Sequence, residues 1–352
     1  MADAIYYTNE DIGGPGKITA TSTSKGPEGL FDVLNACLVT GYGTGEDAKP
    51  GQGWTVVDNS LPLGFKLLAP DGVYYTFCRG PSQAYAYSRA FQVYMSETIS
   101  DPAAYPPQGS NVRSGHHSDD YSAHAYRHWW GLTYYLRSSL HWRLFARGSQ
   151  VLLAVFAGDY SSLTTDYGTT ANSISWDKGN TLFLGNIKAS DPMTPASGPQ
   201  NSCVLGGTNS QPDTWNPSSE CPGGMLYDGY TRLREPVSGA VETASLSRFY
   251  GYPPKLTGLS TYTNDLDLYP ADLEFTQADV WESGRGQLGK VPGLFHMGYN
   301  SHAKLGSVLT MLGRGTGIGD TKAPVMVGDE PFYLFPTVYG SFAMCPLEKY
   351  WV

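Results

Sequence analysis

The chain has 352 residues, of which 41% are hydrophobic and only 16% charged, and its 23 basic and 32 acidic residues give a formal net charge of −9. No block of basic residues could follow a phosphate backbone, so we expect no nucleic-acid partner. No run approaches the roughly 20 apolar residues that cross a bilayer. We therefore expect no membrane insertion. The first residues also lack the charged segment followed by an apolar segment that is typical of a signal peptide, so we expect no export.

Residues 26–43, GPEGLFDVLNACLVTGYG, carry the clearest helical pattern in the chain. Apolar residues recur there at i, i+3, i+4, i+7 and i+8, namely Leu30, Val33, Leu34, Cys37 and Leu38. Pro27 and Glu28 suit a first turn, and Gly41 suits a left-handed C-terminal cap. The pattern predicts an amphipathic helix whose apolar stripe packs on a neighbouring element.

Short apolar or aromatic runs at residues 53–58, 64–69 and 73–80 follow, and a turn at residues 70–72 makes a hairpin of the last two. In residues 84–101 the large side chains fall on one parity, which predicts a long, half-buried strand. We therefore expect residues 1–105 to form one helix packed on an antiparallel sheet. Residues 106–130 are rich in proline, glycine and polar side chains, which predicts a linker or interface loop.

Residues 131–224 are expected to form a β region with long polar loops. Successive strands are predicted at residues 132–139, 140–148, 150–160 and 180–187, and residues 151–156 are apolar on both parities, as in a core strand. Residues 192–224 are poor in apolar side chains and are interpreted as extended surface loops.

The C-terminal region, residues 225–352, returns to short strands separated by glycine and proline. These strands are predicted at residues 273–283, 306–313, 323–329 and 331–345. No fixed-period repeat is visible, which disfavours a solenoid or propeller. The fold class predicted for the whole chain is mainly β (α+β), with antiparallel, sandwich-like sheets and one N-terminal helix. The sequence leaves open whether its regions are separate domains or one continuous fold.

The stretch SGHHSDDYSAHAYRHWWG, residues 114–131, raises the question of a metal site. His124 and His128 are four residues apart, so on a helix both rings would share one face. Four neighbours could complete a shell: His116, His117, Asp119 and Asp120. However, the HExxH pattern is absent and the lead-in is rich in proline and glycine. The aromatic neighbours favour interface histidines, and we predict no metal residue, although metal binding by residues 116–128 stays open.

Other candidate sites are equally short of a catalytic pattern. The glycine-rich residues 313–320 lack the GK[ST] ending of a phosphate loop, and no GxSxG elbow occurs. Asp265 and Asp267 would share one face of a strand, as a glycosidase pair or as a solvated edge, and the edge is favoured. We therefore predict no catalytic or cofactor-binding residue and no enzymatic activity.

Five scattered cysteines leave at least one thiol unpaired in a monomer, which favours a reducing compartment. Cys203 and Cys221 flank a loop-like segment, so a disulfide between them stays open.

Residues 34–43 (LNACLVTGYG), 53–58 (GWTVVD) and the strand block at 73–101 resemble a family of virion structural proteins from tailed bacteriophages. LFLGNI (182–187) and RGQLGKVPGLFH (285–296) are similar to later parts of that family. The His-rich stretch and residues 203–224 depart from its pattern.

The resemblance implies a non-enzymatic particle component without a cofactor. It would assemble in the host cytoplasm and reside in the virion, in several symmetric copies on the tail, neck or baseplate. Its partners would be other virion structural proteins, met through the helix end at 30–43 and residues 106–130 and 192–224. The alternatives are a head decoration protein and a receptor- or glycan-binding tail protein, in which Trp129, Trp130 and Trp142 would stack on sugars.

Overall fold

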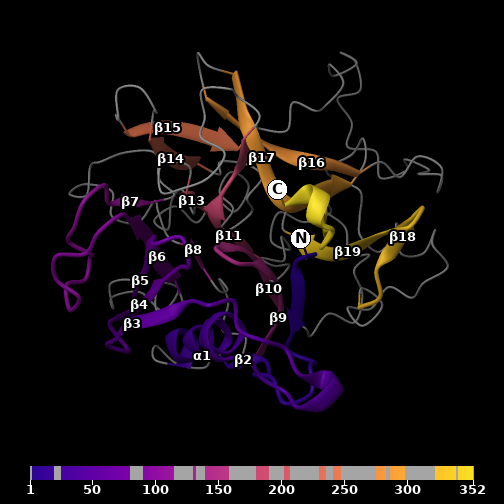
Figure 1. Cartoon of the computed structure of the whole chain (residues 1–352), viewed down its shortest axis with the longest axis horizontal. Coiled ribbons are helices and arrows are strands. Elements are labelled where there is room, and N and C mark those ends of the chain that lie inside the picture. Colours follow the sequence, from indigo (N-terminus) through magenta and orange to yellow (C-terminus); the bar gives the residue numbers. More distant parts are fainter. Residues whose placement is uncertain are drawn as a thin grey trace, which may run out of the picture.

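The computed structural model describes residues 2–19, 25–79, 90–114, 130–131, 139–157, 180–189, 202–206, 230–234, 241–246, 275–282, 286–297, 322–337 and 340–351. These residues form three antiparallel sheets and one α-helix that continues as a π-helix, which confirms the predicted mainly β fold (Figure 1). The predictions at residues 132–138 and 306–313 lie outside the described residues.

The central sheet has the strand order β1–β9–β10–β11–β13, with β2 beside β9. Its strands are β1 (Ile5–Thr8), β2 (Ile18–Thr19), β9 (Ser139–Arg147), β10 (Gln150–Ala157), β11 (Asn180–Asn186) and β13 (Ser202–Gly206). Every residue of 151–156 is buried, which confirms the predicted core strand. Odd residues of this strand enter one hydrophobic core and even residues another, because successive side chains point to opposite faces.

An N-terminal sheet and the helix cover one face of the central sheet (Figure 1). This sheet has β3 (Thr55–Asn59), β4 (Gly64–Leu68), β5 (Tyr74–Arg79), β6 (Ala90–Ser96) and β7 (Arg113–Ser114) in order, with β8 (Trp130–Gly131) beside β6. The helix α1 (Lys25–Leu34) continues as the π-helix η1 (Asn35–Thr40), and its five predicted stripe residues are all buried in this core. Gly41 ends it with a φ of +71°, but its ψ of 175° is extended rather than left-handed helical.

A C-terminal sheet covers the opposite face of the central sheet. Its order is β14–β15–β16–β17–β20–β19–β18, with β12 beside β17. The strands are β12 (Lys188–Ala189), β14 (Tyr230–Arg234), β15 (Val241–Leu246), β16 (Phe275–Glu282), β17 (Gly286–Met297), β18 (Val325–Val327), β19 (Glu330–Thr337) and β20 (Gly340–Met344). The central sheet is therefore the middle of three layers, with a helix-side face and a C-terminal-side face.

The cores cross the boundaries that the sequence suggested. β1 belongs to the predicted 1–105 region but pairs with β9, and β12 from the 131–224 region pairs with β17. Neither core is formed within one predicted region, because each is filled from two layers. Of the two alternatives left open by the sequence, the described residues therefore favour one continuous fold.

Three segments differ from the expectation. The strand β6 is buried on both faces where its side chains are described: Val93 and Met95 share a hydrophobic core with Val204 of β13, and Tyr94 and Ser96 are buried on the other face. Residues 202–206, expected within a surface loop, form the strand β13, whose first three residues are buried. The expected linker at 106–130 begins with a segment that returns to β6 as β7, where Arg113 is buried and lies 3.4 Å from the Glu97 carboxylate.

Candidate functional site

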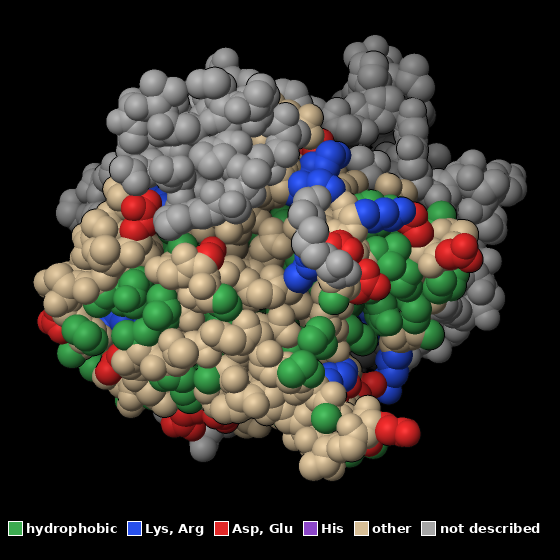
Figure 2. All heavy atoms as spheres, viewed as in Figure 1, with side chains coloured by type: hydrophobic (Ala, Val, Ile, Leu, Met, Phe, Trp, Pro, Cys, Tyr) green, Lys and Arg blue, Asp and Glu red, His purple; other side chains and the backbone are tan. Residues whose placement is uncertain are grey.

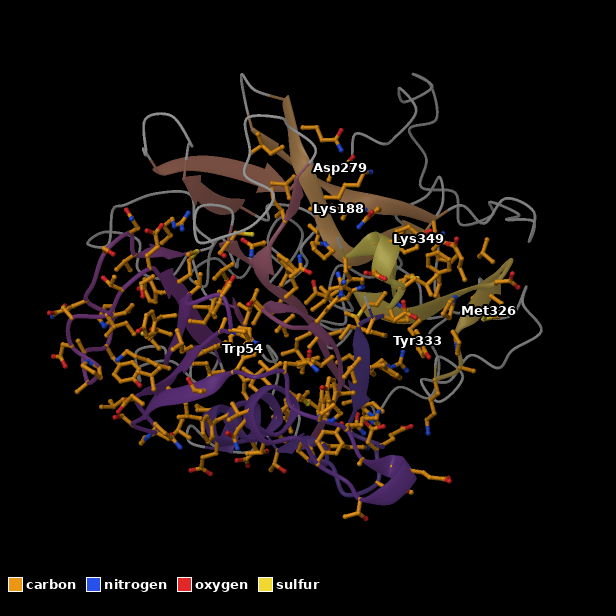
Figure 3. All side chains as sticks on the ribbon, viewed as in Figure 1. Trp54, Lys188, Asp279, Met326, Tyr333 and Lys349 are labelled. Atoms are coloured by element: carbon orange, nitrogen blue, oxygen red, sulfur yellow. The ribbon has the colours of Figure 1, made fainter. Side chains whose placement is uncertain are left out.

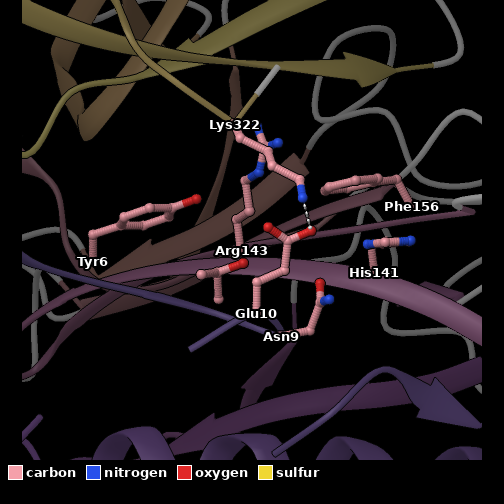
Figure 4. Close-up of a pocket in the computed structure, with 8 residues that line it drawn as sticks. Tyr6, Asn9, Glu10, His141, Arg143, Phe156 and Lys322 are labelled. Atoms are coloured by element: carbon pink, nitrogen blue, oxygen red, sulfur yellow. Dashed lines mark ion pairs between the residues drawn. The ribbon is translucent and has the colours of Figure 1, made fainter. Parts of the chain in front are cut away.

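A small hollow lies on the C-terminal-side face of the central sheet, at the end of the apolar core (Figure 4). Eight residues line it: Tyr6, Thr8, Asn9, Glu10, His141, Arg143, Phe156 and Lys322. They come from β1 and the turn after it, from β9, from β10 and from the segment before β18. It has room for about one water molecule.

Strand pairing explains why these side chains meet. Thr8 lies opposite Arg143 on the neighbouring strand, and Phe156 lies opposite His141. Residues directly opposite in an antiparallel pair point to the same face of the sheet, so all four share the face turned towards the C-terminal sheet. Ala154 lies opposite Arg143 on its other side, and its short side chain leaves space beside the guanidinium group.

Arg143 is the most deeply buried charge of the hollow, with 4% of the residue exposed. Its Nη1 donates a hydrogen bond of 2.6 Å to the Leu334 carbonyl, and its guanidinium carbon lies 5.2 Å from the centre of the Phe156 ring. Burial lowers the pKa of Arg143, but a guanidinium group stays protonated in proteins. The residue therefore brings a permanent positive charge to the inner wall.

Glu10 and Lys322 form the mouth of the hollow with an ion pair of 2.9 Å, drawn as a dashed line in Figure 4. Both side chains remain partly in solvent, at 35% and 56% exposed, so the pair contributes at most about 1 kcal/mol to stability. Such a weak pair can exchange partners.

The turn that carries Glu10 is held from both sides. Asn9 Oδ1 accepts a hydrogen bond of 3.0 Å from the Trp142 backbone N–H. Asp11 Oδ2 accepts hydrogen bonds from the Thr8 backbone N–H, the Tyr42 hydroxyl and Lys49 Nζ, at 2.6–2.9 Å. The Glu10 backbone is therefore fixed, while its side chain reaches Lys322.

His141 stacks on Phe156, with ring centres 5.8 Å apart and planes 8° apart. Burial lowers the pKa of His141 below its usual 6.5, and the cations Lys17, Arg143 and Lys322 lower it as well, whereas Glu10 raises it. The ring is therefore mostly neutral at neutral pH, and it can both donate and accept a hydrogen bond.

None of the described cysteines lines this hollow. Cys37, Cys78 and Cys345 are buried, and burial raises the pKa of each thiol, to about 12 for Cys78 and about 11 for Cys345. A thiol with a raised pKa is a poor nucleophile at neutral pH. Cys203 is buried on β13, and Cys221 lies outside the described residues, so their disulfide stays an open question.

Most of the positions weighed from the sequence lie outside the described residues. These are His116, His117, Asp119, Asp120, His124, His128, Trp129, Asp265, Asp267 and the stretch 313–320. Trp142 is described and is fully buried, with its indole N–H donating to the Gly16 carbonyl at 2.9 Å, so it cannot serve as a sugar platform. Within the described part of the chain, no group of three or more His, Cys, Asp or Glu side chains could hold a metal ion.

The sequence reasoning did not single out the residues of the hollow. One signal was present: in LHWRLF, residues 140–145, His141 and Arg143 alternate with large apolar residues, so the strand presents two basic side chains on one face. Glu10 and Lys322 carry no such signal, because they reach the hollow from distant parts of the chain.

No family model matches the chain, and no curated protein matches its sequence. None of the described helices is both long enough and apolar enough to span a bilayer.

Proposed function

We propose that the chain is a non-enzymatic structural component of a tailed-phage virion that assembles in several copies onto the tail, neck or baseplate. The proposal starts from the sequence resemblance. The residues that carry it are mainly core and turn positions. Leu34, Cys37 and Leu38 lie on the buried face of the helix, and Gly41 ends it. Trp54 is buried, and its indole N–H donates to the Gly148 carbonyl at 2.7 Å. The resemblance thus concerns residues that determine the fold.

The single observation that carries an assembly role is the edge strand β18. Among the described strands it pairs only with β19, so its outer backbone groups face away from the sheet. Met326 and Val327 on this strand are 54% and 43% exposed. Apolar side chains gather at this end of the molecule in Figure 2, and Figure 3 places Met326 at its margin. An exposed apolar edge strand is a template for pairing with another chain.

The hairpin of β18 and β19 holds this edge strand in a fixed position. Val325 and Phe332 lie opposite each other and enter the hydrophobic core, which anchors β18 from within. Gly328 has a φ of +61° in the two-residue turn between β18 and β19, a conformation that glycine adopts at no steric cost. We expect this strand to meet a neighbouring subunit or another virion protein.

The test is incorporation of a Met326→Lys variant into particles. The variant adds a charge to an already exposed position, so the fold should be retained while incorporation falls at least about tenfold. Leu63→Lys is the matched control, because Leu63 is 64% exposed in the turn before β4. Copies of the chain per purified particle are counted by quantitative mass spectrometry.

Normal incorporation of Met326→Lys would contradict a role for β18, and absence of the wild-type chain from purified particles would contradict the virion assignment itself. If the wild-type chain is present in the particles, cryo-electron microscopy distinguishes tail, neck and baseplate positions and counts the copies.

A further inference from the structure

The hollow beside the central sheet carries more positive than negative charge. Two cations, Arg143 and Lys322, line it, and Glu10 is the one carboxylate among the described residues that lines it. The chain as a whole has a net charge of −9, so this local excess is opposite in sign to the rest of the molecule. Such a focus of opposite charge attracts an anion.

The donors are arranged around the same small space. Figure 4 shows Arg143 rising from the sheet and Lys322 descending from the segment before β18, with the ammonium end of Lys322 turned towards Glu10. The phenol of Tyr6 and the ring of Phe156 stand on either side. Since the Asn9 side-chain oxygen already accepts the Trp142 N–H, its amide nitrogen remains to donate.

The carboxylate of Glu10, which already lies at the mouth, indicates which class of anion can bind there. Glu10 reaches Lys322 across 2.9 Å from a partly exposed position, so an incoming carboxylate can take its place on the lysine without breaking a buried pair. A dianion such as phosphate would meet stronger repulsion from Glu10. The flanking aromatic rings suit a flat group, and Arg143, whose Nη1 donates to the Leu334 carbonyl, adds a permanent positive charge at the inner wall.

We propose that the mouth of this hollow binds a carboxylate group in the place where the Glu10 carboxylate now lies, with Lys322 and Arg143 supplying the positive charge and Glu10 acting as the competing internal carboxylate. Two sources provide this group: a free small carboxylate, or an Asp or Glu side chain of a second copy of the chain. The inference does not depend on a role in virions, and its test uses the purified chain alone.

The experiment titrates formate against the full chain at constant ionic strength, with chloride as the replaced anion, and follows the ring signals of His141 by NMR. Formate is expected to bind with a Kd of about 1 mM or weaker, because a ligand of so few atoms cannot bind more tightly. Bound formate places a negative charge near the ring, so the pKa of His141 rises.

Two variants at the mouth are expected to act in opposite directions. Lys322→Gln removes a charge-assisted contact and raises the Kd about five- to tenfold, whereas Lys322→Arg keeps it near the wild-type value. Glu10→Gln removes the competitor and lowers the Kd about threefold or more. Lys290 and Asp279 form another partly exposed ion pair, of 3.1 Å, on the C-terminal sheet, so Lys290→Gln and Asp279→Asn are the matched controls and should not change the Kd for formate.

The proposal requires that Lys322→Gln and Glu10→Gln change the Kd for formate in opposite directions. Equal response of His141 to formate and chloride, or the same Kd in Lys322→Gln and Glu10→Gln, would overturn the proposal. Light scattering distinguishes the two sources of the carboxylate, because it measures whether the chain self-associates. If the wild-type chain self-associates, and both formate and the Lys322→Gln substitution dissociate it, the carboxylate comes from a second copy. Formate binding by a monomer without any effect on association assigns the site to a free carboxylate.

Discussion

On the helix-side face of the central sheet, β9 buries Leu140, Trp142 and Leu144, whereas on the C-terminal-side face the same strand presents His141 and Arg143. Both faces are covered by another sheet, and both lie against a hydrophobic core. The difference is that one face is apolar from Leu140 to Ala146, whereas the other carries one apolar side chain, Phe145, among polar and charged ones.

The two faces of β9 therefore contribute different properties: the apolar face contributes stability, and the charged face contributes groups that can recognise a ligand. An apolar face gains stability from each methylene group that it removes from water, and it offers no group that could recognise a ligand. A charged residue between two sheets needs hydrogen bonds in place of water, as Arg143 obtains from Leu334, and it leaves a positive charge beside a hollow. We therefore expect substitutions on the two faces to have effects of different size and kind.

The largest effect is expected from Trp142→Ala on the helix-side face. Trp142 is fully buried, and truncating such a residue typically lowers the free energy of unfolding by about 3–5 kcal/mol. Urea denaturation followed by fluorescence of the remaining tryptophans measures it. Trp142→Phe keeps most of the packing and should lose less, although it deprives the Gly16 carbonyl of its donor. Similar stability of Trp142→Ala and the wild type would show that this face is not the main source of stability.

A smaller effect is expected from Arg143→Met on the other face. Methionine fills a similar space but leaves the Leu334 carbonyl without this donor, so the free energy of unfolding should fall by about 1–3 kcal/mol. Urea denaturation at neutral pH measures the change. An increase in stability would mean that desolvating the guanidinium group costs more than its contacts return.

The same contrast explains how far the sequence could predict the fold. The helix, the hairpin of β4 and β5 and the core strand β10 were predictable because periodicity and turn residues within one short segment specify them. The short strands β1, β2, β14 and β15 escaped, since their few residues carry little pattern and β1 and β2 find their partner more than 100 residues away.

The hollow was less predictable than the fold for the same reason. Alternation in β9 could have shown that His141 and Arg143 share a face, but it could not show that Lys322 approaches the same face after the chain has built another sheet. Registers such as Thr8 opposite Arg143 depend on pairings between distant segments, and a local pattern specifies faces better than partners.

A still smaller change in stability is expected from Glu10→Gln at the mouth of the hollow. The ion pair with Lys322 is partly exposed, so its loss should lower the free energy of unfolding by less than about 1 kcal/mol. Asp279→Asn on the C-terminal sheet is the control for a comparable pair. A loss as large as that of Arg143→Met would show that the mouth is a structural element rather than an exchangeable contact.

The smallest effect, and the most specific to the mixed face, is a pH dependence that comes from His141. Burial and three nearby cations lower its pKa in the folded chain, so below its usual pKa of 6.5 the unfolded chain binds the proton more tightly than the folded chain does. Stability from this residue is therefore fully present above about pH 6.5 and declines as the pH falls from there towards the lowered folded pKa.

Urea denaturation of the wild type and of His141→Gln between about pH 8 and about pH 5 isolates this contribution, since histidine is the side chain that ordinarily titrates in that window. The wild type should lose more stability than the variant as the pH falls. Lys322→Gln should reduce the loss, because Lys322 lowers the pKa of His141, and Glu10→Gln should enlarge it, because Glu10 raises that pKa. Parallel curves for wild type and His141→Gln would mean that the ring does not sense these charges, and the two faces of β9 would then differ in composition but not in electrostatics.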